Sequence, residues 1–264
     1  MKKIILKTIK WLCILVFGIV TTVFILLAFD QDYHSNGLTL DPDHPIYVQK
    51  EYQTKLDSNH YDSLLTNYGK NKILAKGFEL QCLLALSHYP ELKETPIEFR
   101  VQPTFLPLSS RPAPLSVLLP WIKRKYLIVI SNKSTDFWED ILLKNTPFNE
   151  QVGILGHELG HTVYYQDKSA LQLVNIAYRY EYDEAFHLDF ERETDKRAIA
   201  HGLGYQLYDF AFFVRIATGN SKEEILTEKG DVYLSPLEIA AEMKKFDFYR
   251  DSLDHPDIYF TKLE

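Results

Sequence analysis

Cysteine is scarce in this sequence, which has two cysteines among 264 residues. Neither stands in a Cys-x-x-Cys pair, so the pattern of a cysteine-based zinc site is missing. Cys13 lies in an apolar N-terminal run, which leaves Cys82 without a partner in the rest of the chain. This composition excludes a small fold held together by disulfides. Internal repeats and low-complexity tracts are also missing, and 46% of the residues are apolar, enough for a packed core.

Acidic residues outnumber basic residues in the chain after its N-terminal segment. Four lysines precede residue 11, and the chain after residue 30 has 25 basic and 35 acidic residues, a formal charge of −10. An acidic body of this kind disfavours nucleic acid and anionic membrane surfaces as partners.

One long uncharged run, residues 11–29, precedes this body. As a helix it would span roughly 28 Å, close to the bilayer hydrocarbon thickness of about 30 Å. Lysines before it and Asp30 after it predict a cytoplasmic basic tail (1–10), a single-pass anchor in the cell membrane (11–29) and an extracytoplasmic body. The alternative is a cleaved signal peptide, whose apolar region would be about 7 to 15 residues long and would end in a small-x-small site. The run here ends in "LLAFD".

The rest of the chain predicts a linker and one domain. Residues 30–50 are polar and contain one glycine and two prolines, as in a juxtamembrane linker. Residues 51–264 are sufficient for one large domain.

The first half of this domain predicts a helix and a small sheet. Residues 72–88 are mostly apolar and free of proline, which indicates a buried helix. A strand is predicted within 95–103, and a stronger one at 125–131, "KYLIVIS", which is rich in β-branched residues. The intervening residues, 103–120, contain five of the 12 prolines and predict an irregular surface loop.

The second half is predicted to be helical. Helices are expected over 147–165, 168–180 and 184–201. Thr146 is a suitable N-cap for the first of them, and Gly202 should end the third. Ser235 and Glu238 form a capping box that opens another helix. Strands followed by helices predict an α+β fold that is mostly helical with a small sheet.

The motif "HELGH" at residues 157–161 contains candidate metal ligands and a candidate catalytic residue. His157 and His161 are four residues apart, so on a helix both imidazoles can reach one metal ion. Glu158 lies about 100° further around the axis, where it can reach a metal-bound water. Between Gly153 and Tyr165 it is the only charged residue, and burying it with two histidines would be costly unless a metal were bound.

Gly156 and Gly160 are poor helix formers in the same segment. They predict that another part of the chain packs closely against this helix.

A catalytic zinc ion needs a third protein ligand. Glu191 and Asp195 in "FERETDKRA" are four residues apart on a second predicted helix. We expect Glu191 to be the third ligand, and Asp195 to accept a hydrogen bond from a ligand histidine and so orient its ring. Arg192, Glu193, Lys196 and Arg197 would occupy the outer face of this helix. The competing interpretation is a solvated charged helix.

A metzincin pattern does not fit. Its third ligand would fall at Asp167, but Tyr164 replaces the glycine that turns the chain there. Met243, the only downstream methionine, lies in a predicted helix rather than in a Met-turn.

The pair of motifs, His157-Glu158-x-x-His161 and Glu191-x-x-x-Asp195, resembles the gluzincin zinc metallopeptidases. "FERETDKRA" is most similar to the FExxxDxxA segment of the HtpX and CAAX-prenyl-protease type. The resemblance covers about 50 residues, 150–204, and that group has several membrane spans where one is predicted here. It implies a zincin-like domain with one zinc ion held by His157, His161 and Glu191, and a peptide or protein substrate.

The resemblance also implies a mechanism. A zinc-activated water would attack the peptide carbonyl, with Glu158 as general base and later as proton donor to the leaving amine. Gluzincins use a His or Tyr as a second oxyanion donor, and His255 in "DHPD" is a candidate, although a simple turn explains it equally. "KYLIVIS" resembles the clan's substrate-pairing edge strand, with an interior strand as the alternative.

Two other functions remain open at this point. The first alternative is a zinc hydrolase with a non-peptide substrate, and the second is a zinc-binding sensor or binding module without turnover. An intact Glu158 argues against the second, because a structural zinc needs no general base. The remaining histidines show no ligand spacing and are expected to be ordinary surface or cap residues: His34, His44, His60, His88, His187 and His201.

Overall fold

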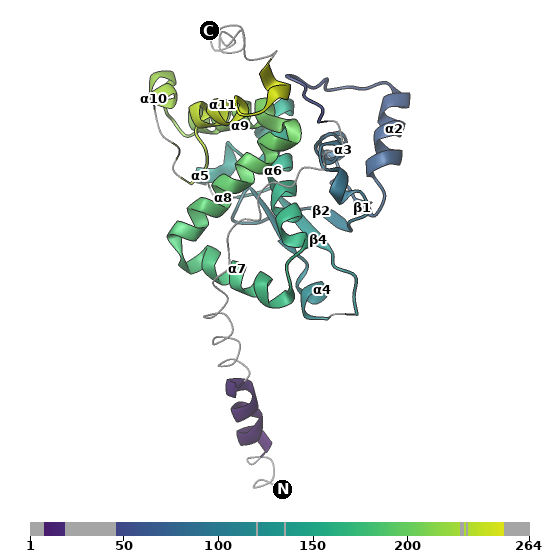
Figure 1. The fold of residues 1–264 in the computed structure, drawn as a ribbon, viewed down its shortest axis with the longest axis vertical. Helices are drawn as coiled ribbons and strands as arrows, with labels where there is room; N and C mark the ends of the chain where they lie inside the picture. Colours follow the sequence, from purple (N-terminus) through teal and green to yellow (C-terminus); the bar gives the residue numbers. More distant parts are fainter. Residues whose placement is uncertain are drawn as a thin grey trace.

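The computed structural model describes residues 8–18, 46–119, 121–134, 136–227, 230 and 232–250. Within these residues the chain has the predicted α+β architecture, with many helices and one small sheet (Figure 1). The helices after residue 46 are α2 (Ser58–Tyr68), α3 (Glu79–Ser87), α4 (Pro114–Leu118), α5 (Asp136–Glu139), α6 (Phe148–Gln166), α7 (Ala170–Tyr182), α8 (Glu184–Ala198), α9 (Gly204–Ala217), α10 (Lys222–Thr227) and α11 (Pro236–Met243).

The sheet has the strand order β1-β2-β4-β3. Its strands are β1 (Lys72–Ile73), β2 (Ile97–Gln102), β3 (Leu108–Pro112) and β4 (Tyr126–Ser131). β2 runs parallel to β1 and β4, whereas β3 pairs antiparallel with β4. All six residues of β4 are buried, as expected for a central strand rich in β-branched residues. "KYLIVIS" is therefore an interior strand, and β3 is an edge strand of the sheet.

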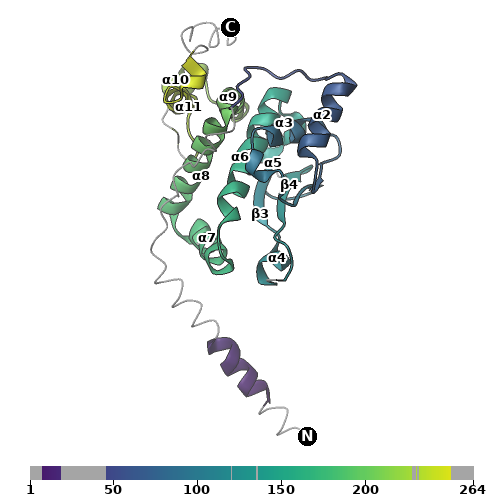
Figure 2. The same ribbon diagram turned by 45° about the vertical axis from the view of Figure 1, so that its right-hand side comes forward.

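Helix α6 runs through the middle of the molecule. It contacts α3 and β3 on one side and α8 and α9 on the other (Figures 1 and 2). A Cβ on Gly153 would lie 2.5 Å from the backbone of Gln206 in α9, and one on Gly160 would lie 3.1 Å from Cγ2 of Thr194 in α8. A Cβ on Gly156 would lie 2.2 Å from Cδ1 of Leu203. The prediction that Gly156 and Gly160 face a closely packed neighbour is confirmed.

Three element predictions need correction. The helix predicted over 72–88 begins only at Glu79, because residues 72–73 form β1 and Gly77 turns the chain with φ at 87°. The predicted loop over 103–120 contains β3 and α4: Pro112 ends the edge strand, where a missing N–H costs nothing, and Pro114 opens the helix. Helix α6 has Pro147 rather than Thr146 at its N-cap.

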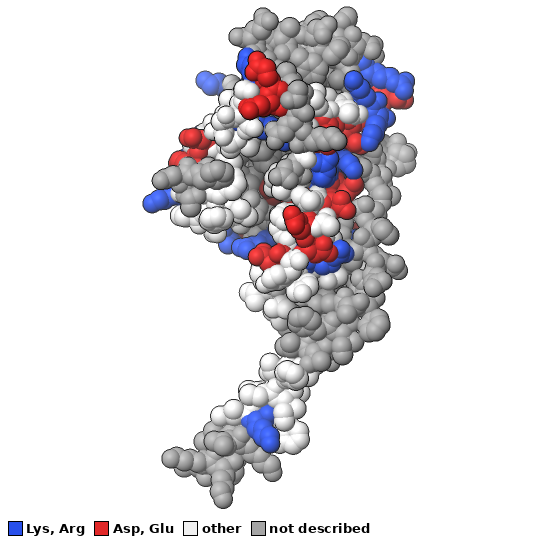
Figure 3. Space-filling model, turned by 90° about the vertical axis from the view of Figure 1, so that its left-hand side faces the viewer, with Lys and Arg blue, Asp and Glu red and all other residues white. Residues whose placement is uncertain are grey.

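The C-terminal half otherwise follows the sequence pattern. Helix α8 ends at Ala198 and continues as a π-helical turn, Ile199–Leu203, in which Gly202 takes φ at 88° and redirects the chain into α9. The capping box of Ser235 and Glu238 opens α11 as predicted. Glu238 also binds Arg192 of α8 at 2.6 Å. Charged side chains of both signs are interspersed over the face shown in Figure 3.

The N-terminal predictions fall largely outside the described residues. Residues 8–18 are helical, and residues 19–45, which include most of the predicted anchor and linker, are not described. In the part of the chain that is described, no helix has the length and apolar content needed to cross a membrane. His255 also lies outside the described residues.

Candidate metal centre

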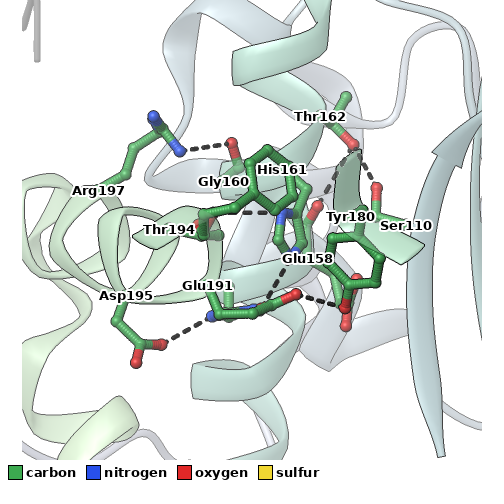
Figure 4. A network of polar contacts seen from close by, with 12 residues as sticks. Ser110, Glu158, Gly160, His161, Thr162, Tyr180, Glu191, Thr194, Asp195 and Arg197 are labelled. Atoms are coloured by element: carbon green, nitrogen blue, oxygen red, sulfur yellow. Dashed lines mark hydrogen bonds and ion pairs between the residues drawn. The ribbon is translucent and has the colours of Figure 1, made fainter. Parts of the chain in front are cut away.

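Helices α6 and α8 bring the predicted ligands together (Figure 4). His157, Glu158 and His161 lie on α6, and their exposed fractions are 2%, 5% and 5%. Glu191 on α8 is equally buried, with 2% of its surface exposed. The predicted contact between these helices is therefore present, although the residues are about 30 positions apart in sequence.

Three ligand atoms converge on one point. Oε2 of Glu191 lies 3.0 Å from Nε2 of His157 and 3.3 Å from Nε2 of His161. The candidate ligand atoms of the three residues all lie within 4.8 Å of one another. Two imidazole nitrogens and one carboxylate oxygen in this arrangement could hold a metal ion.

The second nitrogen of each ring is fixed by a residue of α8. Nδ1 of His157 is 2.8 Å from Oδ1 of Asp195, whose other oxygen accepts a 2.8 Å hydrogen bond from the N–H of Leu234. This is the role predicted for Asp195. Nδ1 of His161 lies 3.1 Å from Oγ1 of Thr194, which itself donates to the carbonyl of Phe190 at 2.8 Å. Because Thr194 donates its hydroxyl proton to that carbonyl, its Oγ1 accepts a hydrogen bond from Nδ1–H of His161. Nε2 of each histidine therefore stays available as a ligand.

Two residues of the site were missed by the sequence analysis. Thr194 is three residues after Glu191 and so shares its inner helix face, a signal that was available from the spacing. Tyr180 on α7 donates a 2.6 Å hydrogen bond to Oε1 of Glu191, which directs Oε2 towards the histidines. No motif in the sequence indicated Tyr180, because its position depends on how α7 packs against α8.

The residues of the cluster shift one another's pKa values. Burial by itself raises the pKa of Glu191, but the neighbouring His161 and His157 outweigh it and hold that pKa well below the usual value. Burial lowers the pKa of His157, yet the hydrogen bonds with Asp195 and Glu191 raise it well above its ordinary value. The Glu191 carboxylate and the His157 ring thus form a complementary charge pair, whereas burial lowers the pKa of the second ring, that of His161.

Glu158 differs from Glu191 in the direction of its pKa shift. Burial raises its pKa to about 8, with the nearby Glu191 adding to the effect and His157 opposing it. Its Oε2 atom has no hydrogen-bond partner among the residues that the structure describes. A buried carboxylate oxygen without a partner is costly, so this atom indicates a group that the site is built to bind.

The backbone of α6 is fixed around the motif. The hydroxyl of Tyr89 donates to the carbonyl of Gly156 at 2.6 Å, and Nη1 of Arg197 donates to the carbonyl of Gly160 at 3.3 Å. The prediction that Arg197 occupies the outer face of α8 is wrong: only 7% of its surface is exposed. Burial lowers its pKa, but the guanidinium stays charged beside these carbonyls.

The other candidates lie elsewhere. Asp167 caps the end of α6 and Met243 is buried in α11, so no metzincin arrangement forms in the described chain. His88 and His201, expected to be surface or cap residues, are buried with 6% and 7% exposed, and His88 is the C-cap of α3. Nδ1 of His88 donates to the carbonyl of His201 at 2.7 Å, and Nε2 accepts from the hydroxyl of Tyr52.

Tyr233 completes the surroundings of the cluster. Its ring centroid lies 5.7 Å from that of His157, and 48% of its surface is exposed. A partly exposed tyrosine ring therefore lies beside one of the two histidines of the cluster.

Comparisons with known proteins were made on the whole chain. No protein-family model, no curated protein and no solved structure matches it.

Proposed function

We propose that this protein is a zinc-dependent peptidase in which Glu158 is the general base. One observation carries the proposal: the buried carboxyl group of Glu158, whose Oε2 has no hydrogen-bond partner among the described residues, lies next to three convergent candidate metal ligands. A purely structural metal site has no use for such a group. The resemblance to gluzincins in residues 150–204 supports the same conclusion.

The donor set is suited to zinc. Two neutral imidazoles and one carboxylate form a common catalytic zinc site, which leaves a fourth position open. His157, His161 and Glu191 would hold the ion. Asp195 and Thr194 keep each ring in the tautomer that presents Nε2.

The chain's own residues would then move the proton. Zinc in such a donor set acts as a Lewis acid, which makes water a nucleophile at neutral pH. Glu158 accepts the proton of that water and passes it to the leaving amine. Tyr233 replaces His255 as our first candidate for the hydrogen-bond donor that stabilises the developing oxyanion, because its ring lies beside His157.

β3 is our candidate for binding the substrate backbone. It is an edge strand of the sheet and packs against α6. The hydroxyl of Ser110 in β3 lies 3.0 Å from that of Thr162, one residue after His161, so the edge has a fixed position relative to the metal centre. A peptide that pairs with this edge would add a strand to the sheet.

The predicted location extends the proposal. A membrane anchor at residues 11–29 would hold the domain outside the cytoplasm, where it would act on peptides or proteins. Which peptide bonds are cut depends on side-chain pockets that the strand pairing does not define.

The test uses the full chain in detergent, with zinc content and hydrolysis of a casein-derived peptide measured together. Glu158→Gln should keep its zinc and lose about 10²–10⁴-fold in turnover. Glu191→Ala should lose both. Glu193→Gln, on the outer face of the same helix, is the matched control and should change neither.

The results separate the competing functions. Full zinc loading of the Glu191→Ala protein would exclude Glu191 as a ligand, and unchanged hydrolysis by Glu158→Gln would exclude it as the base. A zinc-loaded wild-type protein that cleaves no peptide would favour a binding module or a non-peptide substrate.

A further inference from the structure

Two neighbouring elements expose large apolar side chains to solvent. We define the α4–α7 surface by residues of α4, of the turn after it and of α7: Leu115, Leu118, Trp121, Leu171, Val174, Tyr178 and Tyr182. Leu115 and Leu118 are each 68% exposed, Trp121 is 78% exposed and Tyr182 is 74% exposed. α4 and α7 contact one another, so the side chains belong to one region. Grouped apolar side chains of this size mark an interaction site.

In the segment that includes α4, apolar residues are followed by basic residues. Residues 114–125 read "PLSVLLPWIKRK", in which the apolar residues end with Trp121 and Ile122 before three basic residues. Arg124 donates a 2.6 Å hydrogen bond to the carbonyl of Lys168, at the start of α7. This contact places Arg124 beside the start of α7, next to exposed Lys123, whose Nζ donates to the carbonyl of Glu94 at 3.3 Å. Lys123 and Arg124 are the basic rim of the surface.

This pattern fits a phospholipid bilayer better than a protein partner. Tryptophan and tyrosine prefer the membrane–water interface, leucine prefers the acyl region, and lysine and arginine reach the lipid phosphates from just outside it. Because the body is acidic overall, long-range attraction to anionic lipid is weak, and the exposed apolar side chains must provide most of the affinity.

We propose that the α4–α7 surface rests on the phospholipid bilayer, with Leu115, Leu118 and Trp121 inserted at headgroup level and the basic rim at the phosphates. In both ribbon views, α4 and α7 lie at the lower end of the domain, and helix 8–18 lies below that end (Figures 1 and 2). Because Tyr180 of α7 contacts Glu191, this orientation holds the metal centre close to the membrane. The inference goes beyond the proposed function and does not depend on zinc or on hydrolysis.

The test places a spin label on the surface of the full chain in bilayers of phosphatidylcholine and phosphatidylglycerol. Cys13→Ala removes one thiol, and Cys82 is fully buried and out of reach of the label. Leu118→Cys carries the label in the test protein. Leu65→Cys, an exposed leucine of α2, carries it in the control. The measurement compares relaxation of the label by oxygen, which concentrates in lipid, with relaxation by a water-soluble nickel chelate.

We expect the oxygen-to-nickel ratio at position 118 to exceed that at position 65 several-fold, and substitution of Lys123 and Arg124 by glutamine to lower it. Equal ratios at the two positions would overturn the proposal. So would a water-exposed label at position 118 that a casein-derived peptide shields, because the surface would then bind peptide. Since zinc content is not part of the readout, failure here leaves the proposed peptidase untouched.

Discussion

The hydroxyl of Tyr180 donates a 2.6 Å hydrogen bond to Oε1 of Glu191 and thereby leaves Oε2 facing both histidines. The proposed third ligand is thus oriented by α7, a helix that supplies none of the three candidate ligands. Residues that hold a metal ligand in place contribute to affinity almost as the ligands do.

Tyr180→Phe should therefore weaken zinc binding about 10- to 100-fold, because Glu191 loses the contact that directs it. Competition with a chromogenic zinc chelator measures the affinity. Tyr182→Phe, two residues along the same helix and exposed, should bind zinc like the wild type. Equal affinities for all three proteins would show that Tyr180 does not position Glu191.

Thr194→Val should also lower zinc affinity, on the order of 10-fold, because Nδ1 of His161 loses its acceptor while the side-chain volume is retained. Thr194→Ser keeps the hydroxyl and should restore most of the affinity. Calorimetric titration of the metal-free protein with zinc measures the difference. A serine variant as weak as the valine variant would point to packing rather than to the hydrogen bond.

Gly153→Ala should destabilise the fold by about 1–3 kcal/mol, since its Cβ would lie 2.5 Å from the backbone of Gln206, which cannot move aside alone. Gly160→Ala meets a methyl group of Thr194 at 3.1 Å and should cost less. Urea denaturation of the two variants and the wild type provides the comparison. If the Gly160 variant were the less stable of the two, α6 and α9 would not be as closely packed as described.

The stability of the fold should fall in mildly acidic solution because of His88. Burial lowers its pKa to about 4, whereas the unfolded chain has a value of about 6.5. Between these two pH values the unfolded state binds more protons, so the free energy of unfolding decreases as the pH falls. The decrease from this residue is at most about 1.4 kcal/mol per pH unit and is complete near pH 4.

His88→Gln removes this titration and should flatten the pH dependence of the unfolding free energy between pH 6.5 and 4. Denaturation at a series of pH values in the presence of EDTA measures it. His60→Gln, which removes an exposed imidazole, is the control. The same slope in the wild type and His88→Gln would assign the acid sensitivity to other groups.

The sequence was most informative where spacing along a helix determines the geometry. His157, His161, Glu191 and Asp195 follow from the periodicity of two helices, and the structure places them as expected. The same spacing rule would have identified Thr194. The fold class could be predicted from the composition of the strands. The interior position of "KYLIVIS", one of two alternatives, agrees with its many β-branched residues, all six residues of β4 being buried.

What the sequence did not reveal depends on packing between distant segments. Tyr180, Arg197 and His88 each form a hydrogen bond to a residue of another element of the fold. No local sequence pattern encodes these contacts, because they depend on how the elements pack. The proline-rich segment also concealed β3. Its residues have weak strand propensity, and they are extended because β4 supplies the pairing partner.

The short edge strand β3 has a consequence for the solution behaviour of the protein. Exposed sheet edges invite pairing between copies of a chain, and natural proteins suppress such aggregation with short edge strands, charges and prolines. β3 has all three properties, since it is five residues long and ends with Arg111 and Pro112. The edge that we propose to bind peptide is therefore protected against growth into a continuous intermolecular sheet.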